Sequence, residues 1–101
     1  MELNSINAPE KPRESTVRIR RDHVLGYAGD LTTERSNPGA VAANAKVLID
    51  WVETGDAAEQ DARYRSLFRA SNNRDFDRDP DDDPALLIAE AEVFYAFLKA
   101  A

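Results

Sequence analysis

The sequence of 101 residues contains no cysteine. This absence excludes disulfides, zinc sites with thiolate ligands and a cysteine nucleophile. It also fits a reducing compartment, so we expect a cytoplasmic protein. The length is enough for one domain with one hydrophobic core.

Long apolar runs are missing as well. No stretch approaches the roughly 20 apolar residues that a helix needs to span a bilayer. Residues 1–15 lack the apolar core of a signal peptide. With 43% hydrophobic and 32% charged residues, the chain has the composition of an ordinary soluble globular domain, and no membrane partner is expected.

Residue types that commonly carry chemistry are scarce. His23 is the only histidine, and the sequence offers it no recognisable base partner. The four glycines stand singly, at positions 26, 29, 39 and 55, so there is no glycine-rich loop for phosphates. The serines lie in no nucleophile-elbow pattern. We therefore expect a protein that is not an enzyme and that carries no cofactor.

Negative charge is concentrated at one end of the chain. The net charge is −6, and residues 75–101 contain eight acidic side chains against Arg78 and Lys99. In residues 1–35 the six acidic side chains are balanced by six basic ones. A negative field near the C-terminus disfavours the binding of nucleic acid there. It favours the binding of a basic partner or a cation, or it serves only to make the protein soluble.

The aspartate-rich segment, residues 72–83, invites comparison with a calcium-binding loop. The ligand positions 1, 3, 5 and 12 of an EF-hand would be Asp79, Asp81, Asp83 and Glu90. Position 6 requires glycine for the turn, and here it is Pro84. The register that starts at Asp75 also has a proline at position 6. Neither register therefore matches the EF-hand pattern, and no metal is expected.

The strongest helix signal lies in residues 38–54. Asn37 can cap this helix, Pro38 suits its first position, and Gly55 can end it. Its apolar residues cover an arc of about 200°, roughly twice an ordinary core-facing stripe. The helix therefore needs neighbours on more than one side and is the expected centre of a small bundle. Asn44 falls inside the arc and is expected to be a buried amide with a hydrogen-bond partner.

Further helices give an all-α fold, a bundle of three or four helices in one domain, residues 15–101. These helices are expected at about residues 23–33, 57–71 and 84–99. Their expected caps are Asp22, Asp56 and Asp83. Gly26 and Gly29 weaken the first of them, and they either allow close helix contact or make the segment irregular. Trp51 and the three tyrosines lie on apolar stripes and are expected in the core.

The N-terminal part is expected to be less regular. Residues 1–14 have the composition of a flexible tail. In residues 15–21, Val17 and Ile19 alternate with arginines, which predicts a short strand over 16–20 or an extended arm that lies against the bundle. A lone strand cannot satisfy its own backbone groups, so it would have to pair with another copy or a partner.

The helix expected at 84–99 is apolar on two faces. Leu86, Val93 and Phe97 form the second apolar stripe, and Glu90 projects between the two stripes. Either the second stripe lies in a dimer or partner interface, or the first helix and the N-terminal arm cover it. If Glu90 is buried it needs a basic partner, because an unpaired buried carboxylate is costly.

These features favour a non-catalytic protein-interaction module, a small regulatory adaptor, inhibitor or accessory factor that forms a homodimer through its last helix. The expected contact residues are Leu86, Glu90, Val93, Phe97, Asp77, Asp79, Asp81 and Asp82. In a narrower version, the acidic loop imitates a phosphate backbone and blocks a nucleic-acid-binding protein, as small phage-type inhibitors do.

Direct nucleic-acid binding is the alternative from another class. Arg18, Arg20 and Arg21 could form a basic arm for phosphates, joined into one basic face by Arg63, Arg65 and Arg69. Neighbouring acidic residues neutralise most of this charge, and no spacing of a recognition helix is evident. Nucleic acid is therefore not the expected partner.

Overall fold

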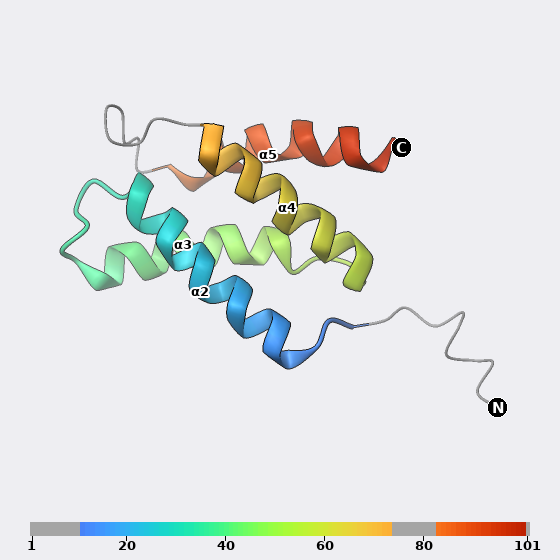
Figure 1. Cartoon of the computed structure of the whole chain (residues 1–101). Helices are drawn as coiled ribbons and strands as arrows, with labels where there is room; N and C mark the ends of the chain where they lie inside the picture. The colour runs from blue at the N-terminus through green and yellow to red at the C-terminus, as the bar shows by residue number, and fades with distance from the viewer. Residues whose placement is uncertain (1–10, 74–82, 101) are drawn as a thin grey trace.

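The computed structural model describes residues 11–73 and 83–100 of the chain. These residues form four helices, α2 (Glu14–Leu31), α3 (Pro38–Val52), α4 (Ala57–Asn73) and α5 (Pro84–Lys99) (Figure 1). The expected all-α bundle is confirmed, and the described residues contain no strand.

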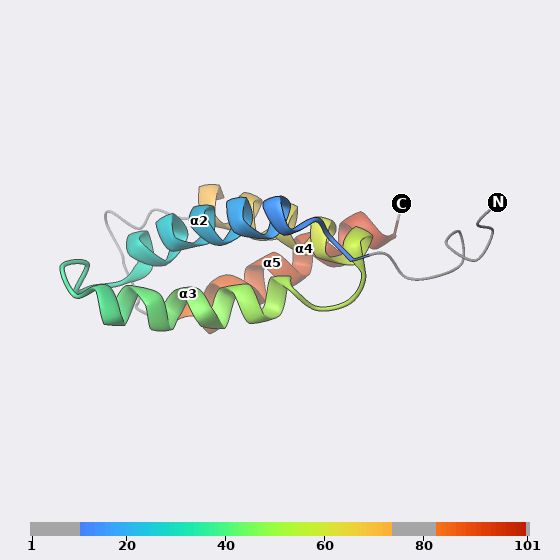
Figure 2. The same cartoon turned by 90° about the horizontal axis from the view of Figure 1, so that it is seen from below.

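Two pairs of helices build the bundle. Helices α2 and α3 run antiparallel to each other, as do α4 and α5, and the two pairs pack together (Figures 1 and 2). Helix α3 contacts each of the other three described helices, which confirms its central place. The wide apolar arc of α3 is thereby explained, because it faces several neighbours.

The core is made of small and medium-sized aliphatic side chains. One fully buried leucine comes from each helix, and the four are Leu31, Leu48, Leu67 and Leu87. Val24, Val52 and four alanines complete the buried cluster. Each helix thus contributes one narrow stripe to a single core.

The starts of α3, α4 and α5 follow the expected capping rules. Asn37 Oδ1 accepts hydrogen bonds from the amides of Gly39 at 3.0 Å and Ala40 at 3.2 Å. Asp83 Oδ1 accepts one from the amide of Ala85 at 3.0 Å. These bonds satisfy amides that have no partner within the helix.

Before α4, Asp56 and Glu59 form a reciprocal capping box. The amide of Glu59 donates to Asp56 Oδ1 at 2.9 Å, and the amide of Asp56 donates to Glu59 Oε1 at 3.1 Å. Gly55, just before the box, has a φ of 87°. A side chain there would be strained and would collide with the carboxylate of Glu59, so glycine is required at this turn.

The prediction of a strand or an extended arm in residues 15–21 is wrong. Helix α2 begins at Glu14, nine residues before the expected start, so Asp22 lies inside the helix rather than at its cap. The core-facing stripe of α2 includes Arg20, Val24 and Leu31. An arginine on that stripe conceals the helical period in the sequence, whereas the alternation of apolar and charged residues imitates a strand.

Neither expectation for the glycines of α2 holds. The helix is continuous through Gly26 and Gly29. No atom outside the local helix lies within 4 Å of a Cβ built on either residue, so they do not serve close helix contact. Both positions have room for a larger side chain.

The expected hydrogen-bond partner of Asn44 is confirmed, but the residue is half-buried rather than buried. Its side-chain amide donates to Thr32 Oγ1 at 2.9 Å, and this hydroxyl in turn donates to the carbonyl of Ala28 at 2.6 Å. Thr32 is fully buried just after the end of α2. The chain of hydrogen bonds therefore ties α3 to the end of α2 and satisfies the buried hydroxyl of Thr32.

We predict that Gly26→Ala and Gly29→Ala each stabilise the protein. Alanine loses less backbone entropy than glycine in a helix and meets no neighbour here, so each change should raise the free energy of unfolding by about 0.5–1 kcal/mol. Urea denaturation measures the effect. Gly55→Ala is the matched control and should destabilise, because its φ is positive and Glu59 blocks the added Cβ. A loss of stability in the α2 variants would contradict the prediction.

Candidate protein-interaction surface

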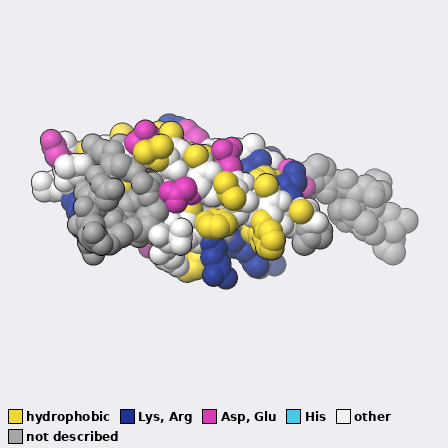
Figure 3. Space-filling model, turned by 90° about the horizontal axis from the view of Figure 1, so that it is seen from above, with side chains coloured by type: hydrophobic (Ala, Val, Ile, Leu, Met, Phe, Trp, Pro, Cys, Tyr) yellow, Lys and Arg dark blue, Asp and Glu magenta, His cyan; other side chains and the backbone are white. Residues whose placement is uncertain are grey.

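The apolar stripe on the outer side of α5 is exposed. The exposed fraction is 49% for Leu86, 68% for Val93 and 78% for Phe97, and the last two are the highest values among the large hydrophobic residues described. In Figure 3, apolar side chains gather on the face seen from above, next to a group of lysine or arginine side chains. We call Leu86, Val93 and Phe97 the α5 stripe.

The other side of α5 packs into the core. Leu87 and Ala91 are fully buried, and Ile88 and Phe94 are packed against them. Helix α5 packs chiefly against α4 and α3. The alternative in which the first helix and the N-terminal arm cover the α5 stripe is therefore wrong for the described residues.

Glu90 belongs to the same face as the α5 stripe. The residues Leu86, Glu90, Val93 and Phe97 follow one another at spacings of four, three and four. This is the spacing of the a and d positions in a coiled coil, which forms a straight seam along one side of a helix. Glu90 is half-buried, so the seam has two apolar ends and one carboxylate near its middle.

A groove opens beside the C-terminal end of this seam. It has a volume of about 310 Å³ and is lined by Phe94, Phe97 and Leu98 of α5 and by Arg65 and Arg69 of α4. Arg65 forms an ion pair with Asp61 at 3.0 Å. Arg69 forms no ion pair with a described residue. The surface around Phe97 is therefore apolar with a basic edge.

The sequence did not assign a place at this surface to Arg65 and Arg69. Arg65 and Arg69 are four residues apart, which places them on one face of α4. This spacing is the feature of the sequence that could have indicated a shared basic surface. Their position next to Phe97 depends on the antiparallel packing of α4 and α5, which the sequence alone does not specify.

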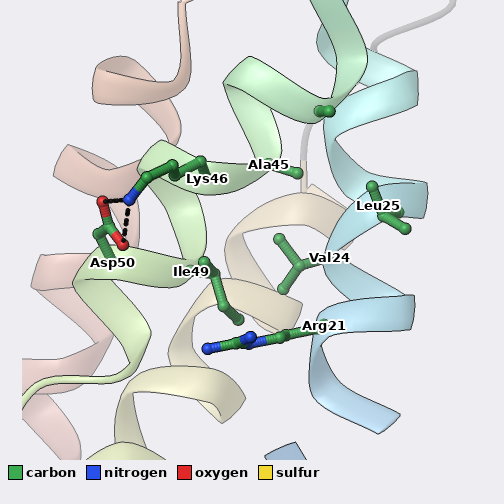
Figure 4. Close-up of a pocket in the computed structure, with 8 residues that line it drawn as sticks. Arg21, Val24, Leu25, Ala45, Lys46, Ile49 and Asp50 are labelled. Atoms are coloured by element: carbon green, nitrogen blue, oxygen red, sulfur yellow. Dashed lines mark hydrogen bonds and ion pairs between the residues drawn. The ribbon is translucent and has the colours of Figure 1, made fainter. Parts of the chain in front are cut away.

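A second groove lies between α2 and α3 (Figure 4). Its volume is about 320 Å³, and Val24, Leu25 and Ile49 form much of its apolar lining. The charged groups at its edge are paired, Lys46 with Asp50 at 2.8 Å, and Arg21 with Glu53 at 2.6 Å. This groove is apolar with a neutralised edge and offers no group suited to hold a charged ligand.

The three arginines of the expected basic arm point to different partners. Arg18 pairs with Glu14 on the same helix, and Arg21 pairs with Glu53, which raises the pKa of the Arg21 guanidinium. Arg20 is only 8% exposed and donates to Asp61 Oδ1 at 3.0 Å. The three side chains therefore do not form one exposed basic face, and nucleic-acid binding gains no support from their placement.

Arg20 belongs to a polar contact between α2 and α4. Its guanidinium lies 5.4 Å from the ring centre of Tyr64. The hydroxyl of Tyr64 also contacts Nδ1 of His23 at 2.5 Å. Burial, and next a hydrogen bond with Tyr64, raise the pKa of the Tyr27 phenol well above its ordinary value. The only histidine of the chain thus takes part in packing between helices.

Trp51 and Tyr95 form an aromatic contact at the other end of the bundle. Their ring centres are 6.2 Å apart in an edge-to-face arrangement. Arg63 lies over both rings, 4.6 Å from the centre of Tyr95 and 5.9 Å from that of Trp51. Such contacts stabilise the packing of α3, α4 and α5. The aromatic side chains are partly buried structural elements, in agreement with their expected place in the core.

The remaining expected contact residues lie outside the described part of the chain. They are Asp77, Asp79, Asp81 and Asp82. Their role in the narrower hypothesis, imitation of a phosphate backbone, therefore stays a prediction. Within residues 11–73 and 83–100, no group of three or more histidine, cysteine, aspartate or glutamate side chains could hold a metal ion.

None of the described helices has the length and apolar content that crossing a membrane requires. In comparisons with known proteins, no family model matches the chain, and no curated protein and no solved structure is significantly similar to it.

We predict that the α5 stripe is dispensable for folding. At low micromolar concentration, Phe97→Ser should change the free energy of unfolding by less than about 0.5 kcal/mol, because the side chain is exposed. Leu87→Ala, in the same helix, should cost about 2–5 kcal/mol because it leaves a cavity in the core. Chemical denaturation compares the two variants. A large loss with Phe97→Ser would show that the stripe is structural.

We also predict that Arg20 is a structural residue. Arg20→Ala removes a mostly buried guanidinium that bonds Asp61, so it should lower stability by about 1–3 kcal/mol. Arg18→Ala is the matched control, since an exposed ion pair within one helix adds about 0.5 kcal/mol at most. Thermal and chemical unfolding measure both. Equal effects of the two substitutions would contradict this assignment.

Proposed function

We propose that the protein is a non-catalytic protein-interaction module that binds its partner through the α5 stripe. The observation that carries the proposal is the exposure of Val93 and Phe97 in a helix whose other side buries Leu87 and Ala91 in the core. A row of large apolar residues exposed to water is unfavourable unless something covers it. Binding of a protein there would remove this apolar surface from water.

The layout of the surface supports a protein as the partner. The α5 stripe extends along most of a 16-residue helix and is about 16 Å long from Leu86 to Phe97. An amphipathic helix of a partner fits such a seam, with its own apolar residues at the same spacing. The basic edge formed by Arg65 and Arg69 would favour acidic residues on that partner.

The chemistry of the described residues also favours binding over catalysis. The grooves are shallow, and their charged groups are mostly paired with one another or with aromatic rings. A regulatory adaptor, inhibitor or accessory factor needs no more than a stable scaffold and an exposed contact surface. Together with the absence of cysteine, this supports a role in the cytoplasm.

The proposal predicts that partner capture depends on the α5 stripe. A tagged wild-type protein and the variant Val93→Glu/Phe97→Glu are each incubated with lysate of the native host, and bound proteins are identified by mass spectrometry. We expect at least one protein that the wild type retains and the variant loses. Two charges in the seam should weaken such a complex at least about tenfold.

The double variant Ile19→Glu/Val47→Glu is the matched control. Ile19 is 57% and Val47 is 43% exposed, and they lie on α2 and α3 rather than on α5. This variant should retain the same proteins as the wild type. A capture pattern that is the same for all three proteins would contradict a role of the α5 stripe in binding.

A further inference from the structure

We infer that a second copy of this chain can occupy the α5 stripe, with the two α5 helices packed antiparallel about a twofold axis between Glu90 and Val93. The inference rests on the proposed function for the surface and adds the identity and orientation of the partner. Three features of the described residues support it, namely the spacing of the seam, its charge polarity and the groove beside Phe97.

The spacing of the seam is the same in both directions. The intervals between Leu86, Glu90, Val93 and Phe97 are four, three and four residues, a palindromic pattern. In an antiparallel pair, Leu86 therefore meets Phe97 of the other copy, and Val93 meets Glu90 of the other copy. The smaller apolar residue of each outer pair lies opposite the larger one, which suits close packing at both ends.

The charges beside the seam are arranged with opposite signs at its two ends. Arg65 and Arg69 lie beside the C-terminal half of α5. Asp83 precedes Leu86, and Glu90 lies in the N-terminal half. An antiparallel pair brings the basic half of one copy to the acidic half of the other. A parallel pair would bring like charges together.

One contact follows from the antiparallel register. Arg69 lines the groove with Phe94 and Phe97, so it lies beside the C-terminal half of α5. Glu90 of the second copy lies opposite Val93, at the same level along the helix. Arg69 makes no ion pair with a described residue of its own chain, whereas Glu90 already has an interaction within its chain, so an ion pair between the copies would form in addition to that interaction or in exchange for it. Two symmetric ion pairs would then flank the apolar contacts.

The small area of the seam limits the affinity that we expect between the two copies. A seam about 16 Å long and one helix, about 10 Å, wide covers an area well below the roughly 800 Å² that each partner buries in a standard interface. A pair of this size is weak, and we expect a dissociation constant between about 10 μM and 1 mM. Analytical ultracentrifugation from about 5 μM to 1 mM should show a concentration-dependent shift from monomer to dimer.

The orientation is tested with cysteines, since the natural chain has none that could interfere. Leu86→Cys and Phe97→Cys proteins are mixed in equal amounts at about 200 μM and oxidised mildly. In an antiparallel pair the two thiols meet, while the opposite end keeps its natural Leu86 and Phe97 contact. We expect the mixed disulfide to exceed clearly the half of all products that random collision gives.

The other orientations give different products. In an antiparallel pair, two copies of the same variant hold their thiols about 16 Å apart along the helices, beyond the roughly 7 Å between Cα atoms that a disulfide spans. A parallel pair would instead give disulfides between identical chains. Products dominated by those, or a random mixture, would overturn the antiparallel arrangement.

The Arg69 and Glu90 contact is tested by charge exchange. Arg69→Glu and Glu90→Arg should each weaken self-association by about three- to tenfold, and the double variant should recover most of the loss. Arg65→Glu is the matched control, because Arg65 already pairs with Asp61 and should have a smaller effect. A double variant that associates more weakly than both single variants would overturn this contact.

Failure of this inference can be separated from failure of the proposed function. A strict monomer up to about 1 mM that still captures a host protein through the α5 stripe would overturn the second copy as partner and leave the proposed function intact. A monomer whose captured proteins do not depend on the stripe would overturn both. A dimer that Val93→Glu does not weaken would place self-association elsewhere and overturn the inference.

Discussion

The fold depends on the meeting of one leucine from each helix in a single core. Leu31, Leu48, Leu67 and Leu87 are all fully buried, and the smaller residues around them fill the remaining space. A four-helix bundle of this size gives each outer helix one buried stripe. Helix α5 has two apolar stripes, and the core can take only the one that contains Leu87. The other stripe is left outside by geometry, whatever its hydrophobicity.

In α5, apolar residues lie outside the core. In α2 the reverse is found, because a charged residue occupies a core-facing position where an apolar residue is expected. Arg20 lies on the core-facing stripe of α2, and it is accommodated because Asp61 and Tyr64 of α4 surround its guanidinium. Its aliphatic stem can pack beside the apolar residues while its charge is paired. This explains why α2 extends to Glu14, and also why the arginine cannot serve a nucleic acid at the surface.

Features that depend on adjacent residues could be predicted from the sequence, whereas features that depend on distant residues could not. The caps at Asn37, Asp56 and Asp83 are read from a few adjacent residues, and the helices begin where they predict. The start of α2 was predicted wrongly because Arg20 on its core-facing stripe is paired with Asp61 of α4, about 40 residues away in the chain. The second apolar stripe of α5 follows from helical periodicity alone, whereas its exposure and its basic edge depend on how the helices pack. Local rules thus located the stripe but predicted neither its exposure nor its charged edge.

The concentration of negative charge before α5 also bears on how two copies can meet. With a net charge of −6, two chains repel each other, and most of the excess charge lies in residues 75–101. In salt of about 0.15 M this repulsion fades over about 8 Å. An antiparallel pair keeps the two N-terminal ends of α5 about 24 Å apart, well beyond this distance, whereas a parallel pair would place them side by side. For the proposed dimer, this distribution of charge therefore favours the antiparallel orientation over the parallel one.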